Sequence, residues 1–180
     1  MSDLPFSLVV NVRRLPKKGE RFRTAADAIT KEYLLSNFDL EDVSALEFEA
    51  EVKPWKRNGV EIMGSVTGDL VQPCAITGKP ISSKMDEQFR VLFVPEGSKL
   101  ALPQLDERGE IVLDMDGDDI PETFTGDSID LAEVWLEFFA LGFDPFAKAD
   151  DAELPQDDDL TKENDAKDSP FAVLADYKNR

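Results

Sequence analysis

Residues 60–95 contain two runs with strand periodicity on either side of a short loop, and this pair constrains the fold more than any other part of the chain. Regularly spaced apolar residues are typical of strands that bury one face. The loop contains Pro73, Gly78 and Pro80, which interrupt regular structure, and Cys74, the single cysteine of the chain. We therefore predict a β-hairpin with an unusual corner. The residues expected in its strands are Val60, Ile62, Val66 and Leu70, then Ile81, Met85, Phe89, Val91 and Phe93.

A third strand is predicted just before this hairpin. From residue 46 apolar and charged residues alternate, which indicates an antiparallel strand with one buried face and one solvent-exposed face. Asn58-Gly59 follows and favours a type I′ turn, because both residue types adopt positive φ values easily. Three strands with short connections form a meander. Gly64 and Gly68 predict a bulge or strong coiling, which could close the sheet partly into a barrel.

Two further segments have helical signals. Thr24 is the predicted N-cap of a shorter, N-terminal helix that ends near Asn37. A long apolar helix is expected after Asp127 or Ser128, with Gly142 in the C′ position that follows its last turn. A short strand is expected within residues 6–12. The predicted fold class is therefore α+β, an antiparallel β-meander packed with these two helices.

The negative charge is concentrated in the second part of the chain. Residues 1–100 have a net charge of −1, whereas residues 101–180 have a net charge of −17. We predict one α+β domain over residues 1–147, an acidic disordered linker over 148–168 and a short C-terminal helical motif over 169–180. In this motif Ser169 is the expected cap. The residues expected to bind a partner, or to dock back on the domain, are Pro170, Phe171, Leu174 and Tyr177.

Residue usage argues against most catalytic and metal chemistry. The chain has no histidine, which removes the commonest metal ligand and the usual catalytic base at neutral pH. An enzyme with Cys74 as nucleophile would need Lys79 or a helix N-terminus to activate the thiol, and we do not favour it. Glu133 and Glu137 fit a solvated helix stripe better than an acid/base pair. We predict no catalytic residue, no metal and no cofactor.

Basic residues cluster between positions 13 and 31. This segment is interpreted first as a solvated loop whose charges balance the acidic remainder of the chain. The alternative is contact with RNA phosphates or with the acidic tail, although Phe22 is the only aromatic residue among the cations. The candidate RNA-contacting residues are Arg13, Arg14, Lys17, Lys18, Arg21 and Arg23.

Three segments resemble the YceD-type family, which is named for the accumulation of large-subunit ribosomal RNA. They are the loop Cys-Ala-Ile-Thr-Gly-Lys-Pro-Ile with the strand after it, the triplet Ile-Asp-Leu that opens the long helix, and the terminal Ser-Pro-Phe-Ala-Val-Leu-Ala-Asp-Tyr-Lys. The family-motif residues of the loop are Cys74, Thr77, Gly78 and Pro80. Many relatives have Cys-x-x-Cys at this loop. Thr77 replaces the second cysteine here, so one chain cannot supply a tetrahedral zinc site.

The resemblance implies a non-enzymatic factor that supports 23S rRNA accumulation and large ribosomal subunit assembly in bacteria. It implies binding to rRNA or to a ribosomal protein of the precursor particles. The alternative is an acidic, protein-binding regulatory module that acts through the C-terminal helical motif. The start of the chain lacks a signal-peptide pattern and no apolar run reaches transmembrane length, so we expect a cytoplasmic protein, without a membrane partner and monomeric.

Overall fold

The computed structural model describes residues 4, 6–102, 108 and 119–153. The chain divides into two units, Met1–Ala149 and Asp150–Arg180, and the first unit contains all the helices and strands described. The predicted linker (148–168) lies largely, and the predicted terminal helix (169–180) entirely, outside the described residues. The elements in order are β1 (Val9–Asn11), η1 (Val12–Arg14), β2 (Glu20–Ala25), α1 (Ala28–Asn37), β3 (Asp42–Trp55), β4 (Gly59–Pro73), β5 (Pro80–Pro95), η2 (Lys99–Ala101), β6 (Glu122–Phe124), β7 (Ser128–Asp130) and α2 (Leu131–Gly142).

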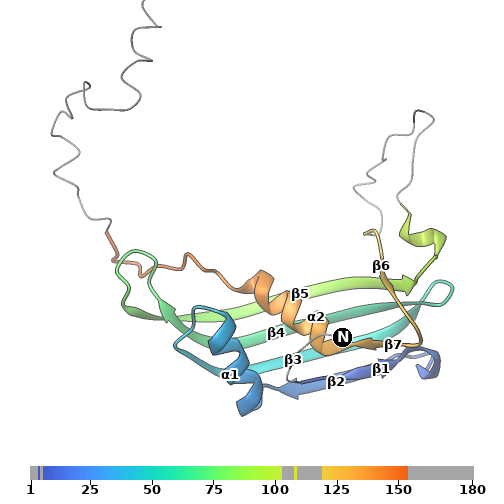
Figure 1. The fold of residues 1–180 in the computed structure, drawn as a ribbon, viewed down its shortest axis with the longest axis horizontal. Helices are drawn as coiled ribbons and strands as arrows, with labels where there is room; N and C mark the ends of the chain where they lie inside the picture. The colour runs from blue at the N-terminus through green and yellow to red at the C-terminus, as the bar shows by residue number, and fades with distance from the viewer. Residues whose placement is uncertain (1–3, 5, 103–107, 109–118, 154–180) are drawn as a thin grey trace, which may run out of the picture. The chain divides into compact units, whose positions relative to one another are not determined.

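The main sheet has the strand order β2-β3-β4-β5-β6 (Figure 1). Strands β3, β4 and β5 form the predicted meander through two successive antiparallel hairpins. Strand β2 adds antiparallel to β3, and the short β6 adds parallel to the end of β5. The expectation of a partly closed barrel is wrong, because the order ends at β2 and β6 and these two strands do not pair with each other.

The turn between β3 and β4 differs from the predicted type I′ geometry. Lys56, Arg57 and Asn58 make a three-residue turn, and Lys56 and Asn58 have φ values of 44° and 66°. Gly59 pairs with Trp55 as the first residue of β4 and does not have a positive φ. The loop is therefore three residues long instead of two, and β3 ends at Trp55, two residues before the position that the Asn-Gly signal indicated.

The irregularity of the sheet lies in β3, not at the two glycines of β4. The register of β3 against β4 shifts between Ser44 and Glu47, where Ala45 has a φ of 48°. Gly68 lies beside this bulge, and a Cβ atom at that position would be 2.8 Å from Leu46 Cδ1. The glycine thus allows the bulged strand to approach β4 closely.

Both helices pack on one face of the main sheet, and their apolar side chains complete the core (Figure 1). Phe138 of α2 stacks on Phe89 of β5 with ring centroids 4.3 Å apart. Trp135 of α2 lies against Phe48 of β3 at 5.8 Å. Residues Val60, Ile62, Val66 and Leu70 of β4 are all buried, as predicted. No helix within the described ranges is both long and apolar enough to cross a membrane.

The predicted helix caps are shifted along the chain. Thr24 belongs to β2, and Asp27 caps α1 by accepting a hydrogen bond from Thr30 N at 2.8 Å. Asp130, rather than Asp127 or Ser128, caps α2 by accepting from Ala132 N at 3.0 Å. Thr24 and Ser128 lie inside the strands that precede the two helices, so the helices begin later than predicted.

A second sheet joins the start of the domain to the beginning of α2. Strand β1 pairs antiparallel with β7, and Val10 is opposite Ile129. The strand expected over residues 6–12 is shorter than predicted, because Leu8 N donates to Asp130 Oδ1 at 2.8 Å and Val12 begins η1. Gly142 is the last residue of α2 and not the residue after it, since the capping N–H comes from Phe143.

Candidate functional site

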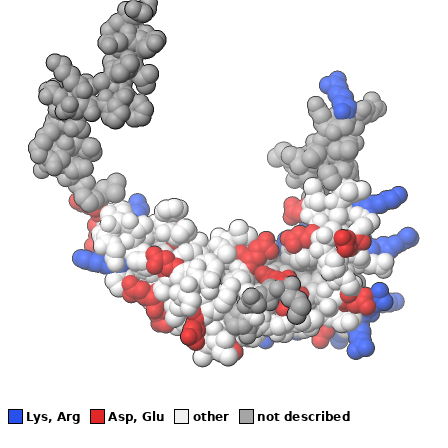
Figure 2. Space-filling model, in the orientation of Figure 1, with Lys and Arg blue, Asp and Glu red and all other residues white. Residues whose placement is uncertain are grey.

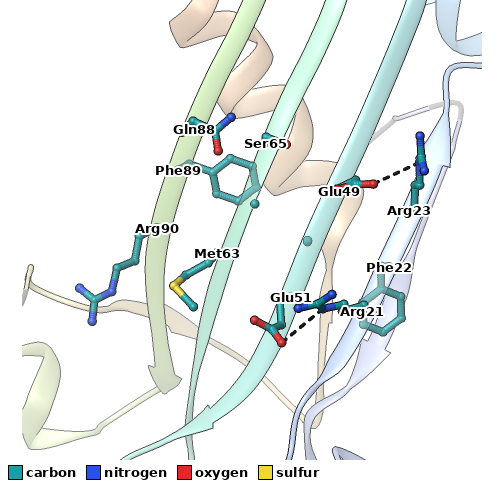
Figure 3. Close-up of a pocket in the computed structure, with 12 residues that line it drawn as sticks. Arg21, Phe22, Arg23, Glu49, Glu51, Met63, Ser65, Gln88, Phe89 and Arg90 are labelled. Atoms are coloured by element: carbon teal, nitrogen blue, oxygen red, sulfur yellow. Dashed lines mark hydrogen bonds and ion pairs between the residues drawn. The ribbon is translucent and has the colours of Figure 1, made fainter.

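The face of the main sheet that points away from the helices carries most of the charged side chains of β2 to β5. A hollow of about 710 Å³ lies on this face, above the central part of the strands (Figure 3). Three arginines from β2 and β5 border it, with Met63 and Ser65 of β4 between them. The arginines are Arg21 and Arg23 of β2 and Arg90 of β5.

Cross-strand carboxylates hold these arginines in place. The β2–β3 register puts Arg21 opposite Glu51 and Arg23 opposite Glu49. Arg21 Nε lies 3.4 Å from Glu51 Oε1, and Arg23 contacts both Glu47, at 2.6 Å, and Glu49, at 3.2 Å. The hydrogen bond and negative charge of Glu47, with the charge of Glu49, raise the pKa of Arg23. Two of the six predicted RNA-contacting cations are therefore engaged with the sheet.

A different group of cations gathers where β4 begins and β5 ends. We call this group the basic end of the domain. Figure 2 shows Lys and Arg side chains projecting there, where Figure 1 places η1, the β3–β4 turn and η2. The basic end consists of Arg13, Arg14, Lys17 and Lys18 from the N-terminal segment, Lys56 and Arg57 from the β3–β4 turn, and Lys99 from η2.

A groove of about 730 Å³ connects the segments of the basic end. Its lining comes from the 12–15 segment, from the β3–β4 turn and from the ends of β5 and β6. Within it Arg13 Nε contacts Asp127 Oδ1 at 2.7 Å, and Lys56 Nζ lies 4.1 Å from the centre of the Trp55 ring. A second hollow is lined by Lys18 and Arg21 together with Glu20 and Glu51. The cations of the basic end thus come from positions up to 86 apart in the sequence.

Five cations of the basic end remain available for a ligand. All five side chains are exposed, and none of them forms an ion pair with a residue in the described part of the chain. Exposed lysine and arginine side chains without a carboxylate partner are the groups that bind phosphate oxygens most readily. These residues are Arg14, Lys17, Lys18, Arg57 and Lys99.

The Cys74 loop lies at the opposite end of β4. Cys74 is 2 % exposed and is held by two backbone bonds, its N–H to Lys79 O and its C=O from Gly78 N, each 2.8 Å long. Gly78 has a φ of 67°, a conformation that favours glycine, whereas Thr77 and Pro80 are exposed on the surface of the loop. The loop is a tight hairpin corner with the sulfur facing inward.

Donors around the sulfur atom favour its charged form. A hydrogen bond from the Thr77 side chain, followed by those from the backbone N–H groups of Ala149 and Thr77, lowers the pKa of Cys74 to about 7. Burial opposes this effect more weakly. The Ala149 N–H lies 3.5 Å from Cys74 Sγ. In the described part of the chain, no group of three or more Cys, Asp or Glu residues could hold a metal ion.

One set of predicted residues lies outside the described part of the chain, and three residues of the basic end were not predicted. The expected partner-binding residues Pro170, Phe171, Leu174 and Tyr177 lie outside the described residues. By contrast, Lys56, Arg57 and Lys99 belong to the basic end although the basic run in the sequence did not include them. The β3–β4 hairpin was the available signal for the first two, because its turn had to lie at one end of the sheet.

A comparison with protein families matches this chain to a family model. The model described as "Large ribosomal RNA subunit accumulation protein YceD" matches residues 62–178. The chain belongs to the YceD family. The YceD span contains the Cys74 loop, all of β5 and α2, and most of the 169–180 segment, whereas residues 13–57 precede it. The YceD name implies a role in the accumulation of the large ribosomal RNA subunit. No curated protein and no solved structure matched the chain.

Proposed function

We propose that this protein is a non-enzymatic factor that supports 23S rRNA accumulation and large ribosomal subunit assembly. It acts in the bacterial cytoplasm, as a monomer, by binding rRNA or a ribosomal protein on precursor particles. The observation that carries the proposal is the YceD match, which extends over 117 residues, from 62 to 178. The exposed cations of the basic end and the acidic second part of the chain support a binding role, because they suit a polyanion and a basic protein respectively.

The groups that the chain contains support the non-enzymatic part of the proposal. There is no histidine, and the one thiol is 2 % exposed, so a substrate has no direct path to its sulfur. The carboxylates of the sheet face are bound to arginine and lysine side chains instead of standing beside a nucleophile. A binding role needs none of these groups to react.

Deletion of the gene, followed by complementation, tests the proposed function. We expect cells without the protein to accumulate less 23S rRNA relative to 16S rRNA and fewer mature large subunits in sucrose gradients. Crosslinking of the full chain in the gradient fractions then identifies the molecule that it touches. Normal 23S rRNA and a normal subunit profile in the deletion strain would rule the proposed function out.

A regulatory protein-binding role is the second candidate. Its support is that the YceD match continues to residue 178 and therefore includes Phe171, Leu174 and Tyr177. A pull-down with the full chain should then recover one non-ribosomal protein, and Phe171→Ala with Leu174→Ala should abolish that recovery. Val173→Ala with Asp176→Ala is the matched control. Recovery of ribosomal components alone would exclude this second role.

A further inference from the structure

We propose that the basic end is a phosphate-binding surface that contacts the backbone of structured RNA, with Arg14, Lys17, Lys18, Arg57 and Lys99 as the contacting residues. This inference rests on the proposed function for its biological setting, but it names a surface and a partner chemistry. Most of these residues lie outside the matched family span, since only Lys99 falls within 62–178.

The first support is the way the fold assembles the surface. Three segments that are distant in sequence supply the five cations. The groove of about 730 Å³ is lined by chain neighbours of these cations, namely Arg13 and Leu15 beside Arg14, Lys56 and Asn58 beside Arg57, and Pro95 four residues before Lys99. The 16–19 segment is a turn closed by a hydrogen bond from Gly19 N to Pro16 O at 2.9 Å. Gly19, with a φ of 81°, packs against Lys53, which leaves Lys17 and Lys18 on the outside. The cations are thus presented on ordered backbone.

The second support is the contrast with the other arginines. Arg21, Arg23 and Arg13 are bound to carboxylates at 3.4 Å or less, so a phosphate would have to displace a partner from each of them. The five proposed residues have no such competitor among the described residues. A polyanion therefore gains a new interaction at these side chains without breaking an existing one.

The third support is the charge of the rest of the molecule. The chain carries a net charge of −18, so RNA is repelled from most of its surface and attracted at the basic end. Strand β4 has 15 residues, which at roughly 3.3 Å per residue separates the basic end from the Cys74 loop by about 45 Å. This distribution of charge orients the RNA as it approaches, so that it contacts the protein at one end of the sheet and not along a face.

The chemistry of these side chains indicates contact with the phosphate backbone of the RNA and not recognition of its bases. Lysine acts as a point charge toward phosphate. Phe124 in the groove is only partly exposed, and the ring of Trp55 is covered by Lys56 at 4.1 Å, so neither ring is an open platform for base stacking. We therefore expect little sequence preference. A logarithmic plot of affinity against salt should have a slope between about −3.5 and −4.5 for five neutralised phosphates.

Fluorescence anisotropy with the purified full chain and a labelled 24-nucleotide RNA hairpin tests the proposal. The three-fold variant Lys17→Ala, Lys18→Ala, Lys99→Ala should bind roughly 10-fold or more weakly and have a salt slope less steep by about 3. Addition of Arg14→Ala and Arg57→Ala should bring the loss to roughly 100-fold. The matched control, Lys79→Ala, Lys84→Ala, Lys148→Ala, removes three lysines toward the other end and should bind within about 3-fold of the wild type.

Three results would overturn the proposal. One is equal RNA binding by the basic-end variant and the wild type, with the melting temperature of both unchanged. Another is equal loss in the control variant, which would indicate a general charge effect. The last is tighter binding to a labelled poly-glutamate peptide than to RNA, which would assign the surface to an acidic protein. A deletion strain with normal 23S rRNA would instead overturn the proposed function while the binding results stand.

Discussion

Gly64 illustrates how one missing side chain shapes the core. It is paired with Ala50 on one side and Phe89 on the other. A Cβ atom at this position would be 2.2 Å from the backbone oxygen of Glu49 and 2.7 Å from Cζ of Phe89. Phe89 in turn stacks on Phe138, so a displaced ring would disturb the packing of α2 on the sheet.

We predict that Gly64→Ala destabilises the domain. Part of the clash is with backbone, which cannot rotate away, so the free energy of unfolding should fall by about 1–3 kcal/mol. Urea denaturation followed by tryptophan fluorescence measures the change. The neighbouring Ser65→Ala is the control and should alter stability by less than about 0.5 kcal/mol. Equal effects of the two substitutions would contradict the steric argument.

The pKa of Cys74 makes stability depend on pH in a defined direction. The folded value of about 7 is below the ordinary value of 9.0, so the folded state favours the thiolate. This contribution is complete above pH 9 and is lost as the pH falls through 7. Cys74→Ala should lower the free energy of unfolding by a constant amount below pH 7, because a packed side chain is lost. Between pH 7 and pH 9 this loss should grow, because the contribution of the thiolate is lost as well.

Urea midpoints of the wild type and Cys74→Ala at several pH values measure this difference. Thr77→Val is a second variant that keeps the thiol but removes the hydroxyl donor, and its thiolate absorbance should appear at higher pH. A stability difference that stays constant from pH 6 to pH 9 would show that hydrogen bonding to the sulfur does not favour the thiolate.

At the scale of elements, Asp130 links three of them. Its carboxylate caps α2 and also accepts hydrogen bonds from Ser7 Oγ at 2.6 Å and Leu8 N at 2.8 Å, just before β1. We predict that Asp130→Ala lowers the free energy of unfolding by about 2 kcal/mol, from the lost cap and the unpaired Leu8 N–H.

Asp127→Ala is the matched control for this element. It removes an exposed ion pair with Arg13, which should cost less than about 1 kcal/mol. Thermal unfolding followed by circular dichroism compares the two variants. If Asp127→Ala were the more damaging substitution, the role of Asp130 as the link between β1 and α2 would be wrong.

The sequence predicted those elements whose pairing is local. The meander β3-β4-β5 followed from period-two patterns joined by short turns, and most of its predicted inward residues are buried, whereas Ile81 and Val91 are only half-buried. Strand β2 was missed because its outward positions, Arg21 and Arg23, were interpreted as part of a basic loop, and their partners lie about 28 positions away. The pair β1–β7 was missed for the same reason, since no local pattern shows which distant strand will be opposite.

The candidate site was predictable only in part. The cations of the 13–18 segment were visible as a run of charge. The run alone did not distinguish Arg21 and Arg23, which are bound to glutamates across the sheet, from Lys17 and Lys18, which are not. It also did not show Lys99, which the end of β5 brings to the same surface through Ser98 N and Pro95 O, 3.0 Å apart.

For the whole molecule, the net charge of −18 predicts two salt effects of opposite sign. Repulsion among the acidic groups destabilises the folded state, so the melting temperature should rise by a few degrees, roughly, between 20 and 300 mM NaCl. Affinity for RNA should fall over the same range, because salt competes at the basic end. Differential scanning fluorimetry at each salt concentration measures the first effect, and a flat or falling melting temperature would contradict it.

The β1–β7 pair has a consequence for the order in which the domain folds during its synthesis. Val10 leaves the ribosome early, but its partner Ile129 is added 119 positions later. At about 5–20 residues per second, β1 waits roughly 6–24 s for its partner. The hairpins of β3, β4 and β5 need no such delay, because each strand meets the preceding one as soon as it emerges. During synthesis the meander can therefore fold first. Strand β1 joins the domain last, when β7 and α2 have been synthesised.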